Sequence, residues 1–168
     1  MAALIVVGKM MKVTIRPAEY VDAAEIHRVF LSAIRAIDDS YYNQAQRDAW
    51  EAAILPESWP TRMLELRFIV AEFDGEIVGF ASWSETVLEH IYVVGIRGRK
   101  GIGSALIESV LENFRDKEVG LIASNNAVSF YARLGFIEEE RLIKQLGSVG
   151  VPCIRMKRPA YSFRNCDN

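Results

Sequence analysis

The hydrophobic and polar positions of the chain divide it into short strands and amphipathic helices. Residues 12–16 (KVTIR) alternate as a strand does, and Pro17 ends the alternation. A helix is predicted next, because Asp22 and Glu25 suit its N-cap and N3 positions and apolar residues follow at helical spacing. These apolar residues are Ile26, Val29, Phe30, Ala33, Ile34 and Ile37. The pattern therefore predicts a strand followed by a helix with one apolar face.

The next pattern predicts a second helix and a β-hairpin. The helix covers residues 44–53 and ends before the prolines of the stretch 56–60. Residues 67–83 (RFIVAEFDGEIVGFASW) then form two runs rich in β-branched and aromatic residues. Asp74 and Gly75 separate the two runs, and this dipeptide is the strongest short-range hairpin signal in the chain.

The C-terminal half alternates between strand and helix patterns. The predicted elements are a strand at 88–94, a helix from Gly101, a strand at 119–123, a helix that Gly135 ends, and a hairpin of residues 140–146 and 151–156. The whole order is β-α-α-β-β-β-α-β-α-β-β. It predicts a mixed sheet with helices on its faces, which is an α/β (α+β) fold.

Composition limits the range of functions. The chain has 168 residues and is 51% apolar, which suits one domain over residues 12–159, with a short extension over 1–11 and a frayed tail over 160–168. A net charge of −2 gives no basic field for nucleic acid or anionic membranes, and no apolar run approaches a membrane span. Cys153 and Cys166 lack metal-ligand spacing. We therefore expect a cytoplasmic protein without a metal, a nucleic-acid partner or a membrane anchor.

One glycine-rich segment suggests an anion site. In residues 97–106 (RGRKGIGSAL), two glycines stand between basic side chains and the predicted helix. The segment is not a Walker motif, because no Gly-Lys-Ser/Thr triplet ends it, and Leu106 occupies the third glycine position of a dinucleotide fingerprint. Glycines let the backbone approach a ligand, and the first N–H groups of a helix favour phosphate. The alternative is a tight turn with solvated basic residues.

A second segment carries a family resemblance. Residues 123–136 (ASNNAVSFYARLGF) resemble the closing motif of the GNAT-type N-acetyltransferases, Ala-x-x-Phe-Tyr-x-x-x-Gly-Phe. The matching residues are Ala127, Phe130, Tyr131, Gly135 and Phe136. Residues 91–106 resemble the acyl-CoA loop of that superfamily, (Gln/Arg)-x-x-Gly-x-(Gly/Ala), and the two segments have the right order and separation. The resemblance covers nearly all of residues 15–159 and implies a mostly antiparallel sheet of about seven strands with helices on both faces.

The chain departs from the family pattern at three positions. Gly98 stands where the family usually has Arg or Gln, so we expect a neighbouring arginine to supply the charge. Ser124 stands where asparagine is common, and Asn125 or Asn126 is expected to take its place. Gly95 replaces a frequent proline, which leaves the entrance to the loop less constrained.

The resemblance implies acetyl-CoA as cosubstrate. Its pyrophosphate is expected on the N–H groups at the start of the helix. Its pantetheine arm is expected along residues 91–93, where that strand separates from residues 119–123. The backbone N–H near Val93 is the implied donor to the reacting carbonyl oxygen. The implied cofactor-binding residues are Ile91, Tyr92, Val93, Arg97, Gly98, Arg99, Lys100, Gly101, Ile102, Gly103, Ser104, Asn126 and Tyr131.

The resemblance also implies the catalytic groups. Tyr131 corresponds to the general acid that protonates the departing thiolate, and a phenol stays protonated at neutral pH. The alternative for Tyr131 is a core aromatic whose hydroxyl bonds a backbone carbonyl. Glu89 is the expected base, because strict alternation places it on the same strand face as Ile91. Glu85, His90 and water remain alternatives as the base.

The acceptor is expected to be a primary amine of a small molecule or peptide. Its walls are implied to come from residues 38–50, and the candidates for an anionic, aromatic surface are Asp38, Asp39, Tyr41, Tyr42 and Trp50. Ordinary helix packing with a solvated turn is the alternative. A non-catalytic acyl-CoA sensor on the same fold is the second function considered, and a binding module that uses the small basic patch is the third. The protein is expected to be a monomer or a homodimer.

Overall fold

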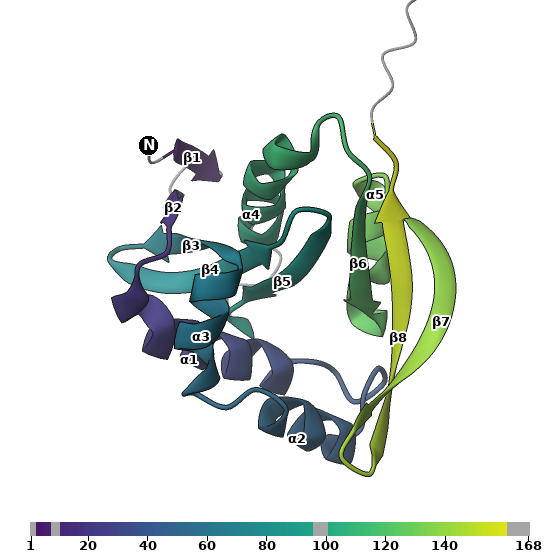
Figure 1. Cartoon of the computed structure of the whole chain (residues 1–168). Coiled ribbons are helices and arrows are strands. Elements are labelled where there is room, and N and C mark those ends of the chain that lie inside the picture. The colour runs from purple at the N-terminus through teal and green to yellow at the C-terminus, as the bar shows by residue number, and fades with distance from the viewer. Residues whose placement is uncertain (1–2, 8–10, 96–100, 161–168) are drawn as a thin grey trace, which may run out of the picture.

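The protein, described by a computed structural model over residues 3–7, 11–95 and 101–160, is built on one mixed sheet (Figure 1). The strands are β1 (Ala3–Val7), β2 (Met11–Pro17), β3 (Arg67–Phe73), β4 (Glu76–Trp83), β5 (Val87–Val93), β6 (Val119–Ser124), β7 (Ile137–Leu146) and β8 (Val149–Arg158). Their order is β1-β2-β3-β4-β5-β6-β8-β7. Only β5 and β6 pair in parallel among the described strands. The predicted mixed, mostly antiparallel sheet is confirmed.

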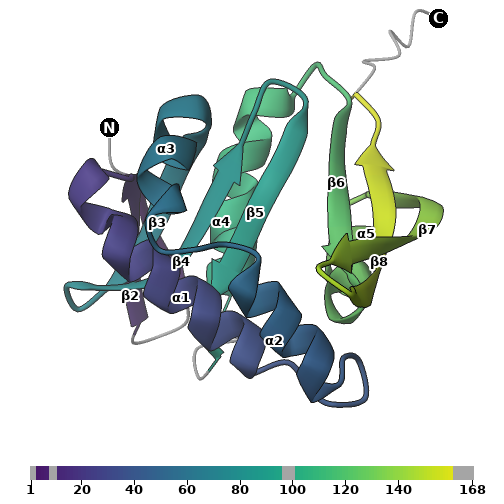
Figure 2. The ribbon, with the colours of Figure 1, turned by 60° about the horizontal axis from the view of Figure 1, so that its bottom comes forward.

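Helices cover both faces of the sheet, as predicted (Figures 1 and 2). They are α1 (Ala23–Arg35), α2 (Gln44–Ala52), α3 (Ser58–Glu65), α4 (Ile102–Leu111) and α5 (Val128–Arg133), with short 3₁₀ turns η1 (Tyr20–Asp22), η3 (Glu112–Phe114) and η4 (Asn125–Ala127). On one face, Phe30 of α1 and Trp59 of α3 are fully buried against Phe80 of β4. On the other face, Leu106 of α4 packs in a second core cluster that also includes Tyr131 of α5. These two clusters fix the helices on either side of the central strands.

Two elements were not expected from the sequence. Strand β1 lies in the segment 1–11 that we expected to be an extension, and it adds an eighth strand to the sheet through its pairing with β2. Helix α3 is absent from the predicted order of elements and occupies part of the proline-containing stretch after the second predicted helix. Pro60 lies in the first turn of α3, where the N–H that proline lacks has no partner in the helix. Burial of Trp59 then anchors α3 on the sheet.

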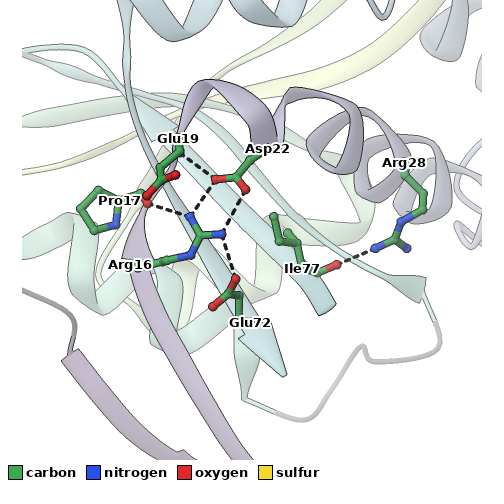
Figure 3. A network of polar contacts seen from close by, with 7 residues as sticks. All are labelled: Arg16, Pro17, Glu19, Asp22, Arg28, Glu72 and Ile77. Carbon is green, nitrogen blue, oxygen red and sulfur yellow. Dashed lines mark hydrogen bonds and ion pairs between the residues drawn. The ribbon is translucent and has the colours of Figure 1, made fainter. Parts of the chain in front are cut away.

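Asp22 does not cap α1 with its side chain, contrary to the sequence prediction. It instead accepts two hydrogen bonds from Arg16, at 2.7 and 3.0 Å, and one from the Glu19 N–H at 2.7 Å (Figure 3). Arg16 also donates to Glu72 of β3 at 2.8 Å. The neighbouring guanidinium of Arg16 explains the change, because a carboxylate gains more from a bidentate arginine than from one helix N–H. The network ties the start of α1 to β2 and β3.

The predicted hairpin turn at Asp74 and Gly75 is confirmed, since both residues have positive φ angles, 51° and 80°. The second hairpin, β7 and β8, is longer than predicted and turns at Gly147. Within the described ranges, no helix is long and apolar enough to cross a membrane.

Candidate active site

Strands β5 and β6 separate after two paired positions. They pair only at Val87 with Gly120 and at Leu88 with Leu121, and Figure 2 shows the two strands diverging from there. On its other side β5 stays paired with β4 as far as Val93. From Glu89 onward, the edge of β5 that faces β6 therefore has no strand partner in the described part of the chain.

The direction of individual backbone groups on this edge follows from one hydrogen bond. The Val94 N–H donates to the Val78 carbonyl of β4 at 2.9 Å. Successive N–H groups of a strand point to opposite sides, so the Val93 N–H points away from β4 and toward the gap. By the same alternation the Ile91 N–H also points toward the gap. Two donors of β5 thus face the space between the diverging strands.

Two adjoining cavities lie in this space. The smaller has a volume of about 70 Å³ and includes Ile91, Ala127 and Tyr131 in its lining. The larger, of about 310 Å³, includes Tyr42, Arg62 and Lys144. The residues common to both linings are Trp50, Leu88, Glu89, His90, Tyr92, Ile122 and Ser124. Shared walls make the two cavities neighbouring compartments of one site.

Tyr131 reaches the smaller cavity from α5. The residue is only 8% exposed, and its ring packs against Phe130 and Phe136 with centroid separations of 5.2 and 5.6 Å. Its hydroxyl makes no hydrogen bond to any described residue, unlike that of a core tyrosine satisfied by a backbone carbonyl. Burial raises the pKa of the Tyr131 phenol far above its ordinary value. The site therefore contains a protonated donor without an acceptor among the described residues.

Glu89 borders both cavities, but strict alternation does not place it there. The register between β4 and β5 shifts by one residue at this point, since Ser82 pairs with His90 whereas Trp83 pairs with Leu88. Glu89 is the extra residue of this irregularity. Leu88 consequently joins the core cluster in which Ile91 packs, and the Glu89 side chain is exposed. Strict alternation, on which the face-sharing argument for Glu89 relied, is therefore interrupted at that residue, although Glu89 does line the site.

His90 is held as a neutral imidazole. Its Nδ1 lies 2.7 Å from the Ser82 hydroxyl, and its ring packs 5.6 Å from Trp59. Burial, followed by the charges of Arg62 and Lys144, lowers the pKa of His90 to about 3. An imidazole with so low a pKa is a weak base at neutral pH, which disfavours His90 as the proton acceptor.

The glycine turn meets the open end of the same strand edge. Gly101 has a φ of 78°, a left-handed conformation that favours glycine, and α4 starts at the next residue. The first helical hydrogen bond of α4 runs from the Ala105 N–H to the Gly101 carbonyl. The N–H groups of Ile102, Gly103 and Ser104 therefore precede the helical ladder and can bind an anion.

The other predicted cofactor-binding residues are distributed differently. Arg97, Gly98, Arg99 and Lys100 lie outside the described residues. Ile91 and Val93 pack toward α4, whereas Tyr92 packs toward α1. Asn126 is exposed in η4 and is not among the lining residues of the two cavities. At Gly95, an added Cβ would lie 2.2 Å from the Ala36 Cβ. This close approach leaves no room for a Cβ atom at position 95, which explains why the chain has glycine there.

Tyr42 joins the two halves of the molecule beside the site. Its hydroxyl donates to the Pro152 carbonyl at 2.7 Å and accepts from the Asn125 N–H at 2.7 Å. Since Tyr42 follows α1, these bonds connect the α1–α2 segment to β8 and to the turn before α5. The sequence suggested Tyr42 only as an acceptor wall, and nothing local indicated this bridging contact.

The charges around the larger cavity differ from those expected. Tyr42 and Trp50 line it, but Asp38, Asp39 and Tyr41 do not. Asp38 accepts from the Ser40 N–H at 2.9 Å, and Asp39 pairs with Arg47 at 2.5 Å. The charged residues of the lining are Arg62, Lys144 and Glu89. Sequence reasoning missed Arg62 because it lies on α3, and it missed Lys144 because no motif marks that strand position.

Comparisons with known proteins agree with this geometry. The family model described as "Acetyltransferase (GNAT) domain" matches residues 37–157, a range that includes every residue lining the two cavities. The uncharacterized N-acetyltransferase YafP of Escherichia coli K12 is 26% identical over 135 residues, which is 79% of this chain and 88% of that protein. A GCN5-related N-acetyltransferase structure from Rhodopseudomonas palustris is 25% identical, with a TM-score of 0.80 over 86% of this chain and 94% of that chain. The structure of yncA from Salmonella typhimurium, solved with acetyl-CoA, is 21% identical, with a TM-score of 0.61 over 88% of this chain and 93% of that chain.

Proposed function

Because the chain belongs to the GNAT acetyltransferase family, we propose that it transfers an acetyl group from acetyl-CoA to a primary amine of a small molecule or peptide. The observation that carries this proposal is the unpartnered Tyr131 hydroxyl, at a cavity between two diverging strands. A phenol that no described residue satisfies is available to a ligand, and its raised pKa keeps it protonated. Names of relatives such as YafP support acetyl transfer as the activity.

The described residues fit acetyl-CoA as the donor. The N–H groups of Ile91 and Val93 face the gap and suit the extended, amide-rich pantetheine arm. The first N–H groups of α4, at Ile102, Gly103 and Ser104, suit the pyrophosphate. Arg97, Gly98, Arg99 and Lys100 precede this turn in sequence, and we propose that their charges and backbone complete the phosphate site. We also propose that Tyr92 and Asn126 contact the bound acetyl-CoA. The acetyl-CoA bound in the yncA structure supports the same ligand here.

Each chemical step is assigned to a group of this chain. Acetyl-CoA supplies an acyl group activated as a thioester. Tyr131 donates its proton to the departing thiolate as a general acid. The Val93 N–H donates to the carbonyl oxygen as negative charge develops on it, since it points into the gap. Glu89 accepts the proton of the attacking amine through solvent, because its carboxylate is exposed and borders both cavities.

The test is release of free thiol from acetyl-CoA over a panel of amines. Amine-dependent release, with Tyr131→Phe slower than the parent, supports an enzyme. Binding of acetyl-CoA without turnover of any amine would instead support the acyl-CoA sensor as the function. We propose the cytoplasm as the site of action, since Cys153 is a free, buried thiol.

A further inference from the structure

The larger cavity contains an arginine, Arg62, that has no partner among the residues that the structure describes. Arg62 lies on α3 and lines the cavity, and its Nε atom is buried without a hydrogen-bond partner. No ion pair joins Arg62 to any described carboxylate. Two other poorly exposed arginines are both paired, Arg16 with Asp22 at 2.7 Å and Arg47 with Asp39 at 2.5 Å. A partly buried guanidinium normally has a carboxylate or another acceptor as its partner. The lack of such an acceptor beside Arg62 therefore points to a ligand that supplies one.

The positive charge of Arg62 affects His90, on the wall that the two cavities share. Arg62 and Lys144 both lower the pKa of His90, which lies where the two cavities meet. Lys144, on β7, is exposed and adds a second cation to the lining. Glu89 is the carboxylate of this lining, and the neutral His90 adds no charge. The cavity is therefore net cationic, which is unfavourable for polyamines and other acceptors with several ammonium groups.

We infer that the acceptor is a small amine that also carries a carboxylate, and that Arg62 binds this carboxylate. The inference rests on the proposed acetyl transfer for its reaction and names the substrate class. Arginine binds a carboxylate through two parallel N–H donors, and Lys144 attracts the same group as a point charge. The apolar part of the acceptor packs on Trp50, Tyr42 and Tyr92, which form the aromatic wall.

The volume and charge of the cavity agree on this class. A cavity of about 310 Å³ is at the small end for ligand sites, so it suits an amino acid better than a folded protein segment. Cations nearby also disfavour the ammonium form of the acceptor and lower the pKa of its amine. The neutral amine is the nucleophile. The cations that bind the carboxylate of the acceptor therefore also favour the reactive, neutral form of its amine.

The experiment compares acids with their own amides and decarboxylated amines. The probes are phenylalanine, phenylalaninamide and phenethylamine, together with leucine, leucinamide and isoamylamine. For each we measure kcat/KM by thiol release in the parent, Arg62→Gln and Arg67→Gln. Arg67 is an exposed arginine on β3 outside both cavities, which makes it the matched control. For each variant we take the ratio of kcat/KM for the acid to kcat/KM for its amide or decarboxylated amine. Comparing this ratio between variants cancels the different intrinsic reactivities of the amines.

We expect Arg62→Gln to lower kcat/KM for the acids by at least about tenfold and to leave the amides within about twofold, as expected for one charge-assisted contact. Arg67→Gln should change neither. Arg62→Gln should also melt as the parent does, since Arg62 has no described protein partner to lose. Calorimetric binding of phenylalanine and phenylalaninamide, in the presence of CoA, gives a second measurement that does not need turnover.

The outcomes separate this inference from the proposed function. Turnover of amides and amines with no preference for the acids, unchanged by Arg62→Gln, would overturn the inference and leave acetyl transfer intact. Phenylalanine binding that is lost in Arg62→Gln, without thiol release from any amine, would support the carboxylate site and contradict the enzyme. If no acid binds or reacts, or if Arg62→Gln leaves the acid-to-amide ratios of kcat/KM and of affinity as they are in the parent, the inference is wrong.

Discussion

Replacing Tyr131 by phenylalanine separates a catalytic role from a structural one. The change removes one oxygen and keeps the ring that packs against Phe130 and Phe136. It also removes the donor that we assign to the departing thiolate. We therefore expect kcat to fall while the affinity for acetyl-CoA and the melting temperature stay nearly constant.

The expected magnitudes follow from the surroundings of the hydroxyl. General-acid contributions amount to roughly a hundredfold or more in rate, so kcat should fall by at least that factor. The hydroxyl has no hydrogen-bond partner among the described residues, so the mutation breaks no bond within that part of the protein. A core tyrosine bonded to a carbonyl would instead lose about 1 kcal/mol of stability. Since burial raises the pKa of Tyr131, the parent should also keep its activity at alkaline pH without a decline from phenol ionisation.

The assay measures thiol release, acetyl-CoA binding by calorimetry and thermal unfolding on one preparation. Tyr20→Phe is the matched control, because Tyr20 is 60% exposed and lies outside both cavities. A thioester with a more acidic leaving thiol should recover part of the lost rate in Tyr131→Phe, since its departure needs less protonation. A kcat within about twofold of the parent, well below the effect of a lost general acid, would refute the assignment.

Three further changes test other parts of the structure. Gly103→Ala should weaken acetyl-CoA binding by about tenfold in calorimetry, because a methyl group obstructs backbone approach to phosphate; the protein itself accommodates this methyl, whose nearest neighbour is 3.6 Å away. Tyr42→Phe should lower the free energy of unfolding by about 1–3 kcal/mol in urea titrations, since it leaves the Asn125 N–H and a carbonyl unsatisfied. Asp22→Asn should cost about 1–3 kcal/mol of unfolding free energy at pH 7. The pKa of Asp22 is held below its ordinary 3.8, chiefly by Arg16, so this difference should shrink as the pH falls below that value.

Each of these three predictions can be contradicted by a specific result. Unchanged affinity in Gly103→Ala would mean that the turn before α4 does not meet phosphate. A Tyr42→Phe variant as stable as the parent would show that its two hydrogen bonds contribute little to joining the halves. A cost of Asp22→Asn that does not decline at all as the pH falls below 3.8 would place the effect in packing rather than in charge, because the charge contribution is lost as the carboxylate of Asp22 becomes protonated.

Local sequence signals predicted the elements whose geometry depends on a few adjacent residues. Asp74 and Gly75 specify their turn through positive φ, and the segment around Tyr131 forms the predicted helix. The prediction failed where tertiary contacts decide. No element was predicted around Pro60, but burial of Trp59 stabilises α3 there, and the first turn of a helix tolerates proline.

The site was predictable only in part, for a similar reason. The strand irregularity at Glu89 has no signal in the local alternation, yet it decides which side chains of β5 join the core. Of the two candidate acids, Asp38 is bonded within its own loop and Asp39 pairs with Arg47 of α2. Helix α3 contributes Arg62 to the cavity instead. A motif specifies residues that contact the common ligand of a family, whereas acceptor residues come from elements that differ in sequence and are brought together only by folding.

The charges of the larger cavity connect the proposed acceptor with the proposed chemistry. Arg62 and Lys144 are opposed within the lining by Glu89 alone, so a bound carboxylate would bring the cavity to electrical balance. That balance holds when the acceptor amine is neutral and is lost when the amine is an ammonium. His90 does not alter this balance, because its pKa of about 3 keeps it uncharged. The cavity therefore favours release of the amine proton before attack, and the exposed Glu89 of the lining is the group that we propose passes that proton to solvent.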